Sequence, residues 1–409
     1  MATSPIDRSS EIVRALEIQS AFMIESDTVT DFLSAHLRSD AGQPAPAWPE
    51  HWKSGADIDF IRSQIAFHGI QVLLAIRKNQ LADWPSDIAS EIADEARLMG
   101  LWEETHKAIL VKLLETLATA NTKSVLMKGT ALAYSHYPDP AMRRRGDTDL
   151  LVREKDLEQA RASLRACGFE RRQDPHGLYF QETWLYDTGA EFVHSVDLHW
   201  EPTDRPVLQK VLRIDEYLES TVPLPRLSPH AFAPNPVLTL IQIAFNQEWH
   251  RTRGLFVDDE RVLGGWRLIW SADYDLLARG FVDEDWDLLV TISNSRNAGP
   301  LVHDALARAA KDLSTPVPDT VMSDLQREPD DRTIIDYLSR PDQIGEFEAD
   351  LQASSGFVAK SKLLFSNLFP SRDHLISKYP ERSDWPTVAL QFRRLTEIGR
   401  RVFARGGQP

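Results

Sequence analysis

Cysteine is almost absent from this sequence of 409 residues, in which Cys167 is the single example. One cysteine excludes an intrachain disulfide and a zinc site built on several thiolates, as is typical of proteins in a reducing compartment. No stretch approaches the ~18 uninterrupted apolar residues of a membrane helix, and residues 1–20 contain no signal-peptide core. We therefore expect a cytoplasmic protein that does not span a membrane.

Positive charge is the second scarce feature. The chain has 46 Lys and Arg against 61 Asp and Glu, which gives a formal net charge of −15. A net charge of this sign opposes non-specific binding to phosphate backbones and to anionic lipids, so neither a nucleic acid nor a membrane is an expected partner. The composition, 42% hydrophobic and 26% charged, is that of a globular protein and excludes a disordered chain.

The spacing of apolar residues divides the chain into three parts. Apolar residues recur at three and four positions over most of residues 1–120, which predicts an N-terminal helical unit. Extended runs and helices alternate over residues 121–225, which we expect to form a catalytic core. Five prolines in residues 222–236 predict a linker, and helical spacing then returns over residues 226–409. The predicted fold class is α+β, with a small mixed sheet flanked by two helical units.

The central part contains the predicted strands. The pattern predicts strands over residues 124–128 and 147–152, and two more that begin at Leu178 and Glu191 and pair as a hairpin. A helix is predicted over residues 154–166, because apolar residues recur there with helical period. This order of elements is that of a mixed sheet with helices on its faces.

Two carboxylates lie on one face of the strand predicted over residues 147–152. Alternate side chains of a strand share a face, so Asp147 and Asp149 project together, roughly 6.5 Å apart. Such a pair suits two Mg²⁺ ions in phosphoryl chemistry, with Mn²⁺ as an alternative, and a third acid usually completes the second metal shell. Asp197 supplies that acid if its strand lies beside the first, and His199 then shares its face.

Segments close to these acids suit a triphosphate. Gly129 opens a predicted helix, whose first N–H groups favour an anionic phosphate. Lys128 and Arg143 add cations in the same region, together with Arg144 and Arg145. For Lys128 a solvent-facing strand end is an equal alternative, and at least one of the three arginines is expected to pair with surface acids in an exposed loop.

Together these motifs resemble the DNA polymerase β-like nucleotidyltransferase superfamily and, within it, a bacterial family of uncharacterised nucleotidyltransferases. The likeness extends over about residues 60–310 and rests on Lys128-Gly129, Tyr137-Pro138, Arg143, Asp147-Thr148-Asp149-Leu150-Leu151-Val152 and Asp197-Leu198-His199-Trp200. The chain departs from the superfamily at Thr130, where Ser is usual, and in a longer interval between Gly129 and Asp147. The resemblance implies a sheet of the nucleotidyltransferase type.

The resemblance also implies roles for individual residues. Asp147, Asp149 and Asp197 would bind the metal ions and carry catalysis, while Gly129 and Thr130 would line the triphosphate. The implied reaction is Mg²⁺-dependent transfer of a nucleoside monophosphate from an NTP, for example ATP, to a hydroxyl group with release of pyrophosphate. The acceptor stays open between a small molecule, a sugar and a protein side chain.

Two other functions are compatible with the same residues. The first is a non-catalytic nucleotide-binding or interaction protein that has kept the fold, although the presence of all three acids argues against it. The second is a phosphotransferase or hydrolase that uses the same metal ions, which would release orthophosphate instead of pyrophosphate. The oligomeric state is left open by all three hypotheses.

Several polar residues are expected to have structural roles only. A zinc site around Asp197 and His199 lacks a third and a fourth ligand, so we expect His199 to pack beside the acids and support them. Asp273 and Asp275 are expected on a solvated helix face. Cys167 precedes a glycine at a predicted helix end with no base nearby in the sequence, so we expect it to be buried and inert.

Overall fold

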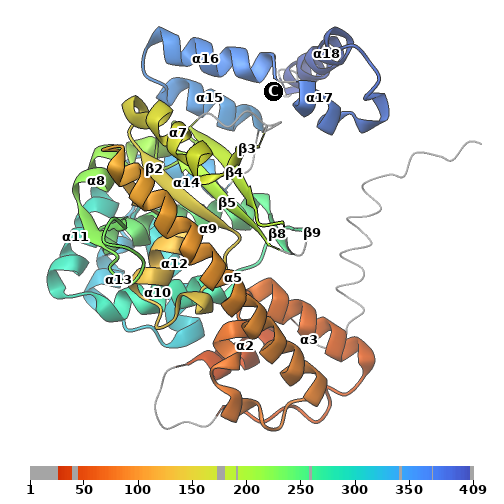
Figure 1. Cartoon of the computed structure of the whole chain (residues 1–409), viewed down its shortest axis with the longest axis vertical. Coiled ribbons are helices and arrows are strands. Elements are labelled where there is room, and N and C mark those ends of the chain that lie inside the picture. Colours follow the sequence, from red (N-terminus) through yellow and green to blue (C-terminus); the bar gives the residue numbers. More distant parts are fainter. Residues whose placement is uncertain are drawn as a thin grey trace, which may run out of the picture.

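The computed structural model describes residues 26–38, 45–172, 180–189, 192–257, 260–339, 343–370 and 372–405. The sheet lies in the middle of the molecule, with the first helices at one end and the last helices at the other (Figure 1). This arrangement confirms the α+β fold class. Residues 1–25 of the predicted N-terminal helical unit lie outside the described residues.

The N-terminal part is helical, as predicted. Its elements are α2 (Ser26–Leu37), α3 (Gly55–His68), α4 (Gln71–Ala75), η1 (Lys78–Leu81) and α5 (Ser86–Thr119). Ser54 and Asp57 form a capping box at the start of α3, and Gly69 ends that helix in the left-handed region, where a glycine has no steric penalty. The end of α5 buries Leu110, Leu113, Leu114 and Leu117. This long helix therefore joins the N-terminal part to the sheet.

The central sheet has five strands in the order β1-β2-β5-β4-β3. The strands are β1 (Ser124–Leu126), β2 (Asp147–Val152), β3 (Glu170–Arg171), β4 (Gln181–Asp187) and β5 (Val193–His199). β2 and β5 are parallel, whereas the other pairs are antiparallel. The predicted strands and hairpin are confirmed, although the predicted first residues of β4 and β5, Leu178 and Glu191, lie outside the described residues.

Two helices connect the strands. α6 (Lys128–Ser135) begins two residues after β1, which shortens the strand predicted over residues 124–128. A 3₁₀ turn, η2 (Pro140–Met142), then leads to β2. After β2, η3 (Glu154–Asp156) precedes α7 (Leu157–Cys167), so the predicted helix begins three residues late and ends at Gly168 with φ of 97°. Cys167 is buried at this end, as expected.

The segment predicted as a linker, residues 222–236, is a packed hairpin. Most of it forms the two antiparallel strands β6 (Thr221–Pro223) and β7 (Phe232–Pro234) and the turn between them. The linker prediction was wrong because proline content signals an irregular backbone but not exposure. The apolar residues between the prolines are buried in the same cluster as the sheet: Leu224, Leu227, Ala231 and Ala233.

The C-terminal part is helical apart from one short hairpin. Before β6 the chain forms η4 (Leu208–Lys210) and α8 (Ile214–Glu219), and after β7 it forms α9 (Pro236–Arg253), β8 (Leu255–Val257), β9 (Glu260–Val262), α10 (Leu268–Gly280), α11 (Asp283–Ser295), α12 (Gly299–Leu313), α13 (Asp319–Leu325), α14 (Thr333–Ser339), α15 (Gln343–Ala353), α16 (Gly356–Leu368), α17 (Arg372–Lys378), η5 (Pro380–Arg382) and α18 (Thr387–Arg405). Gly264 and Gly265 have positive φ, a backbone conformation that suits glycine, and α10 begins three residues after them. No helix of the described residues is both long and apolar enough to cross a membrane.

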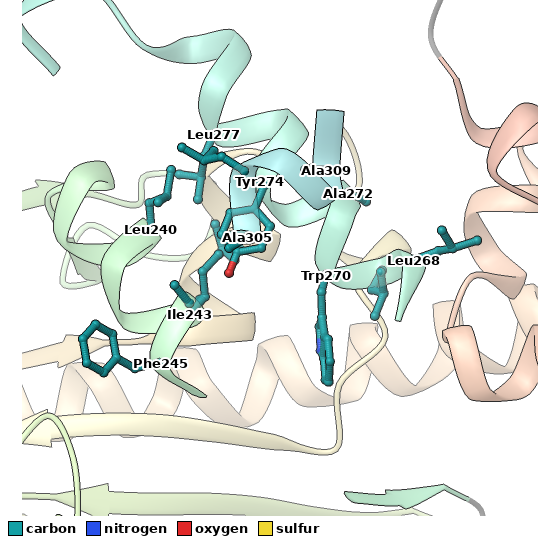
Figure 2. Close-up of a cluster of buried hydrophobic side chains, with 14 of the residues drawn as sticks. Leu240, Ile243, Phe245, Leu268, Trp270, Ala272, Tyr274, Leu277, Ala305 and Ala309 are labelled. Atoms are coloured by element: carbon teal, nitrogen blue, oxygen red, sulfur yellow. The ribbon is translucent and has the colours of Figure 1, made fainter. Parts of the chain in front are cut away.

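α9, α10 and α12 form the core of this part. Their side chains Leu240, Ile243, Tyr274, Leu277 and Ala305 meet in one cluster (Figure 2). The same cluster includes Val125, Met127 and Leu151 from the sheet side, and Gln242 Nε2 of α9 lies 3.3 Å from Met127 Sδ, directly after β1. α9 therefore packs against the turn between β1 and α6.

Candidate active site

Three predicted site residues lie on the same face of the sheet. Asp147 and Asp149 alternate along β2, and Asp149 is paired in register with Asp197 of the parallel neighbour β5. Oxygens of Asp149 and Asp197 and a ring nitrogen of His199 all lie within 4.8 Å of one another. A divalent ion could be held by such a group, since carboxylate oxygens suit Mg²⁺ and Mn²⁺.

Asp149 lies at the centre of this group. Its Oδ1 accepts a hydrogen bond from Lys128 Nζ at 2.5 Å and lies 2.9 Å from His199 Nε2. Burial of the side chain, which is 6% exposed, opposes ionisation. The positive charge of Lys128 and the hydrogen bond from His199 outweigh burial and lower the pKa of Asp149. Asp149 is therefore ionised, and the solvent-facing alternative for Lys128 is wrong.

Asp147 lies at the exposed start of β2. Desolvation by the surrounding protein, followed by the negative charges of Asp149 and Asp197, raises its pKa to about 7. A carboxylate in this position is stabilised by any cation that binds between the acids. The three charges are thus held together against their mutual repulsion, as is common where a protein binds a metal ion.

Asp197 is oriented by the neighbouring strand β4. Thr183 Oγ1 donates to its Oδ1 at 2.7 Å, and Gln181 Nε2 donates to its Oδ2 at 3.1 Å. Burial and the charge of Asp149 raise the pKa of Asp197, and the Thr183 hydroxyl opposes that rise. The sequence analysis did not single out Gln181 and Thr183. The hairpin register pairs Thr183 with Asp197 and Gln181 with His199, so a prediction of this register would have placed both residues beside Asp197.

His199 was expected to pack beside the acids, and it is 1% exposed. Its Nε2 contacts Asp149, which fixes the orientation of the ring, and Nδ1 is buried without a hydrogen-bond partner among the described residues. The imidazole therefore both supports Asp149 and lies close enough to Asp197 to share a bound ion. The structure thus places His199 beside the acids, buried and in contact with Asp149, where it was expected to pack.

The turn between β1 and α6 brings Lys128 and Gly129 to the acids. Lys128 has φ of 48°, a left-handed conformation that is uncommon for a residue with a side chain. Met127 N donates to the backbone oxygen of Asp149 at 2.9 Å, which ties this turn to β2. A Cβ at Gly129 would make only ordinary contacts with Arg145 and Arg143. The phosphate-binding role of Gly129 stays a prediction.

The three arginines differ in their surroundings. Arg143 donates to both carboxylate oxygens of Asp273 on α10, at 2.7 and 2.8 Å. The expectation that Asp273 and Asp275 are solvated was wrong, since they are 0% and 6% exposed and α10 is covered on almost all sides. Arg144 lies 3.6 Å from Glu95, and both are partly exposed, as expected for one member of the three. Arg145 is buried with Glu103 of α5.

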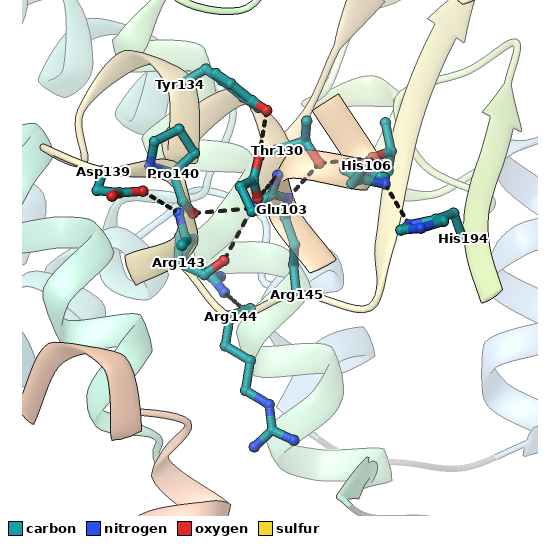
Figure 3. Close-up of polar contacts among 12 residues, drawn as sticks. Glu103, His106, Thr130, Tyr134, Asp139, Pro140, Arg143, Arg144, Arg145 and His194 are labelled. Atoms are coloured by element: carbon teal, nitrogen blue, oxygen red, sulfur yellow. Dashed lines mark hydrogen bonds and ion pairs between the residues drawn. The ribbon is translucent and has the colours of Figure 1, made fainter. Parts of the chain in front are cut away.

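The opposite face of β2 carries a buried polar network that the sequence did not reveal (Figure 3). Thr148 Oγ1 lies 2.8 Å from His106 Nε2 and 3.0 Å from Thr130 Oγ1. His106 Nδ1 is 3.1 Å from His194 Nδ1, which joins α5 to β5. Burial lowers the pKa of His106, so this ring is neutral. Since Thr130 is 1% exposed, its hydroxyl belongs to this network, and its contact with a triphosphate stays a prediction.

Arg145, in the loop before β2, connects this loop to the buried network. Its Nε donates to Thr130 Oγ1 at 3.1 Å, and its Nη2 pairs with Glu103 at 2.7 Å. Tyr134 donates to the same carboxylate. The guanidinium also lies 5.3 Å from the Trp102 ring. These contacts hold the residues before Asp147 against α5 and α6.

Asp147 and Asp149 line a pocket of about 1040 Å³, which we call the main pocket. The sheet and its loops also contribute Lys128, Gly129 and Arg143, and the other lining residues come from α9, β8, the start of α10, Arg205 and Glu346. Trp249 of α9 is one of them, with the guanidiniums of Arg205 and Arg253 over its ring at 4.3 and 3.8 Å from the centroid. The division into residues 1–120, 121–225 and 226–409 stays a prediction, and the main pocket draws on two of these parts.

Comparison with known proteins gives a family. The model of the family described as uncharacterised nucleotidyltransferase matches residues 54–313, which is more than half of the chain. One similar solved structure is an antigenic nucleotidyltransferase-like protein from Paracoccidioides brasiliensis, at 15% identity and a TM-score of 0.30, over 56% of this chain and 95% of that chain. Among curated proteins, none matches this chain significantly.

Proposed function

The chain belongs to the uncharacterised nucleotidyltransferase family, a family of transferases, and on that premise we propose that it moves a nucleoside monophosphate from an NTP to an acceptor hydroxyl. The observation that carries the proposal is that ligand atoms of Asp149, Asp197 and His199 lie within 4.8 Å of one another, while Asp147 and Asp149 line the main pocket. The pocket has room for a nucleotide and an acceptor together, since sites for drug-sized ligands have volumes of roughly 300–1,000 Å³.

The donor set fits divalent ions. Asp147, Asp149 and Asp197 offer carboxylate oxygens, and the pKa of Asp147 is raised by desolvation and then by the like charges of Asp149 and Asp197, which a cation would compensate. We assign Mg²⁺, with Mn²⁺ as the alternative, to these three residues. When bound, such ions supply charge neutralisation at the triphosphate and at the leaving pyrophosphate. His199 orients Asp149 through its Nε2, as partners of metal-binding carboxylates commonly do.

The remaining residues divide the work of binding and proton transfer. Lys128, Gly129 and Arg143 face the main pocket and would bind phosphate oxygens. In the reaction the acceptor oxygen forms a bond to the α-phosphorus, the bond from that phosphorus to its β-bridging oxygen breaks, and pyrophosphate leaves. We assign to Asp197 the proton of the acceptor hydroxyl, because Gln181 and Thr183 hold its two oxygens in place.

The experiment that tests this function is pyrophosphate release by the full chain. Each of the four NTPs is incubated with MgCl₂, MnCl₂ or EDTA and with acceptors that carry hydroxyl groups, and pyrophosphate and orthophosphate are measured separately. Pyrophosphate that depends on the metal supports the proposal. Orthophosphate alone indicates a hydrolase or phosphotransferase, and nucleotide binding by calorimetry without any turnover indicates a non-catalytic nucleotide-binding protein.

The proposed class of acceptor rests on the net charge of the chain. A net charge of −15 disfavours a nucleic acid, so we propose a small molecule, a sugar or a protein side chain. Tight binding of tRNA or DNA that weakens steeply with salt would contradict this choice. A cytoplasmic location stays a prediction.

A further inference from the structure

A second, smaller cavity opens beside the acids. It has a volume of about 60 Å³ and lies between the end of β5, the residues before η4, and α9. Lys128, Arg205, Asn246 and Trp249 line both this side cavity and the main pocket, so the two spaces adjoin. Gln181, which donates to Asp197, is also part of its wall. The side cavity is therefore next to the group that we assign to the acceptor proton.

Three residues that line the side cavity have a buried polar atom without a hydrogen-bond partner among the described residues. These atoms are His199 Nδ1, Arg205 Nε and Gln242 Oε1. Arg205 Nε lies 3.4 Å from Asp204 Oδ2 but makes no hydrogen bond with it. A buried polar atom that lacks a partner costs about 1–3 kcal/mol, so three around one small cavity indicate a missing polar ligand.

The amide of Gln242 has a defined orientation. Its Nε2 lies 3.0 Å from the backbone oxygen of Pro202, which can only accept, so the amide nitrogen is on that side. The atom without a partner is therefore the oxygen, an acceptor. Arg205 Nε is a donor in every protonation state found in proteins. The cavity wall thus offers at least one acceptor and one donor.

An acceptor and a donor in one cavity wall favour a hydroxyl group as the ligand. A hydroxyl both donates and accepts, whereas a carboxylate or phosphate anion accepts and an ammonium group only donates. At about 60 Å³ the side cavity has room for a water-sized polar group and the carbon that carries it, since one water molecule needs only ~10–15 Å³ of such space. Leu208, Leu212 and Phe245 supply apolar contacts for that carbon.

We propose that the side cavity binds a hydroxyl-bearing end of the acceptor, and that the acceptor is a polyol or sugar with at least two hydroxyl groups. One hydroxyl is held by Gln242 Oε1 and Arg205 Nε, and another lies at Asp197 for transfer. This inference rests on the proposed function for the identity of the ligand as acceptor. The polar cavity itself does not depend on the reaction.

Binding is tested with three small probes that share a two-carbon frame. Ethylene glycol, acetate and ethylenediamine end in hydroxyl, carboxylate and ammonium groups, and saturation-transfer NMR on the full chain with Mg²⁺ and a non-hydrolysable ATP analogue measures their binding. We expect ethylene glycol to bind and to be displaced by glycerol. Equal or stronger binding of acetate or ethylenediamine would overturn the hydroxyl assignment.

Two variants and one control locate the site. Gln242→Met removes the amide oxygen with little change of volume, and Arg205→Lys removes Nε–H but keeps the charge. Each should weaken glycol binding about 5-fold, the effect of losing one hydrogen bond of about 1 kcal/mol. Gln247→Met is the control, because Gln247 is on the same helix, is 2% exposed and also has an amide oxygen without a partner, but does not line the side cavity.

The control should bind glycol as the wild type does. Equal binding by the wild type, Gln242→Met and Arg205→Lys, with unchanged thermal unfolding, would overturn the proposal. Gln242 lies on α9 and Arg205 before η4, so failure of one variant to fold leaves the other as a test.

A transfer assay separates this inference from the proposed function. The chain is incubated with MgATP and glycerol or glucose, and nucleotidylated products are detected by mass spectrometry. A product that falls about 5-fold in Gln242→Met but not in Gln247→Met supports both proposals. Glycol binding that responds to the variants without any pyrophosphate release contradicts the proposed function alone, whereas pyrophosphate release with no response to the variants contradicts the side cavity alone.

Discussion

The two faces of β2 differ in how their charges are compensated. On the pocket face, Asp147 and Asp149 lie beside Asp197, and desolvation together with the charges of Asp149 and Asp197 raises the pKa of Asp147 to about 7. On the opposite face, Thr148 joins a network in which the buried charge of Arg145 is compensated by Glu103. The comparison suggests that one face stabilises the fold while the other keeps unfavourable charges for use in binding a cation.

The largest effect is expected from Asp149→Asn. This change removes the central negative charge of the pocket face with almost no change in volume, so transfer should fall by about 1,000-fold, the size of effect seen when a group that stabilises developing charge is removed. Steady-state pyrophosphate release measures it. Far-ultraviolet circular dichroism should be unchanged.

The control for this variant is Asp287→Asn, at an exposed position on α11 outside both pockets. It should retain full activity. If Asp149→Asn and Asp287→Asn release pyrophosphate at the same rate, Asp149 has no place in the site.

The second effect concerns stability and the opposite face. Arg145→Met leaves Glu103 as a buried carboxylate without its cation, which should reduce the free energy of unfolding by about 3–5 kcal/mol. Urea denaturation gives the value. Arg144→Met, at the next residue and partly exposed, should cost less than about 1 kcal/mol. Similar losses for the two arginines would mean that the buried network does not carry the stability of this loop.

A smaller effect is expected when the network loses one hydroxyl. Thr148→Val keeps the shape and the strand preference of the side chain but leaves His106 Nε2 without its 2.8 Å contact, at a cost of about 1–3 kcal/mol. The same urea titration measures it. Thr183→Val, which touches the pocket face instead, should lower activity more than stability, because its hydroxyl orients Asp197. The reverse order for the two threonines would contradict the division of roles.

The smallest change in stability is expected from Asp147→Asn, and unlike the changes above it should not be a loss. Asp147→Asn relieves repulsion on the pocket face, since Asp147 is partly exposed and has a raised pKa, so the midpoint of urea unfolding at pH 8 should stay the same or rise while transfer is lost. A clear fall in stability would show that Asp147 contributes to the fold, and the contrast between the faces would then fail.

The sequence predicted the pocket face well for physical reasons. Alternation along residues 147–152 fixes which side chains share a face, and this rule needs no knowledge of distant contacts. A later strand with Asp197 and His199 then needed only to lie beside the first. The register, with Asp149 opposite Asp197, satisfies that condition.

The features that the sequence missed depend on distant contacts. Asp273 was assigned to a solvated helix face, but α10 is surrounded by protein, and its partner Arg143 is 130 residues away. The proline-rich residues 222–236 pack as a hairpin because of the apolar side chains between the prolines. Gln242 and Arg205 belong to no local motif. Only the structure shows that both line the side cavity.

The central claim is that the acids of β2 and β5 hold divalent ions against a nucleotide. The most direct test is a crystal structure with Mn²⁺ and a non-hydrolysable ATP analogue, in which anomalous scattering locates manganese. The account predicts manganese bound by the carboxylates of Asp149 and Asp197 and by phosphate oxygens in the main pocket. Manganese bound to the phosphates alone, with Asp149 still paired to Lys128, would contradict it.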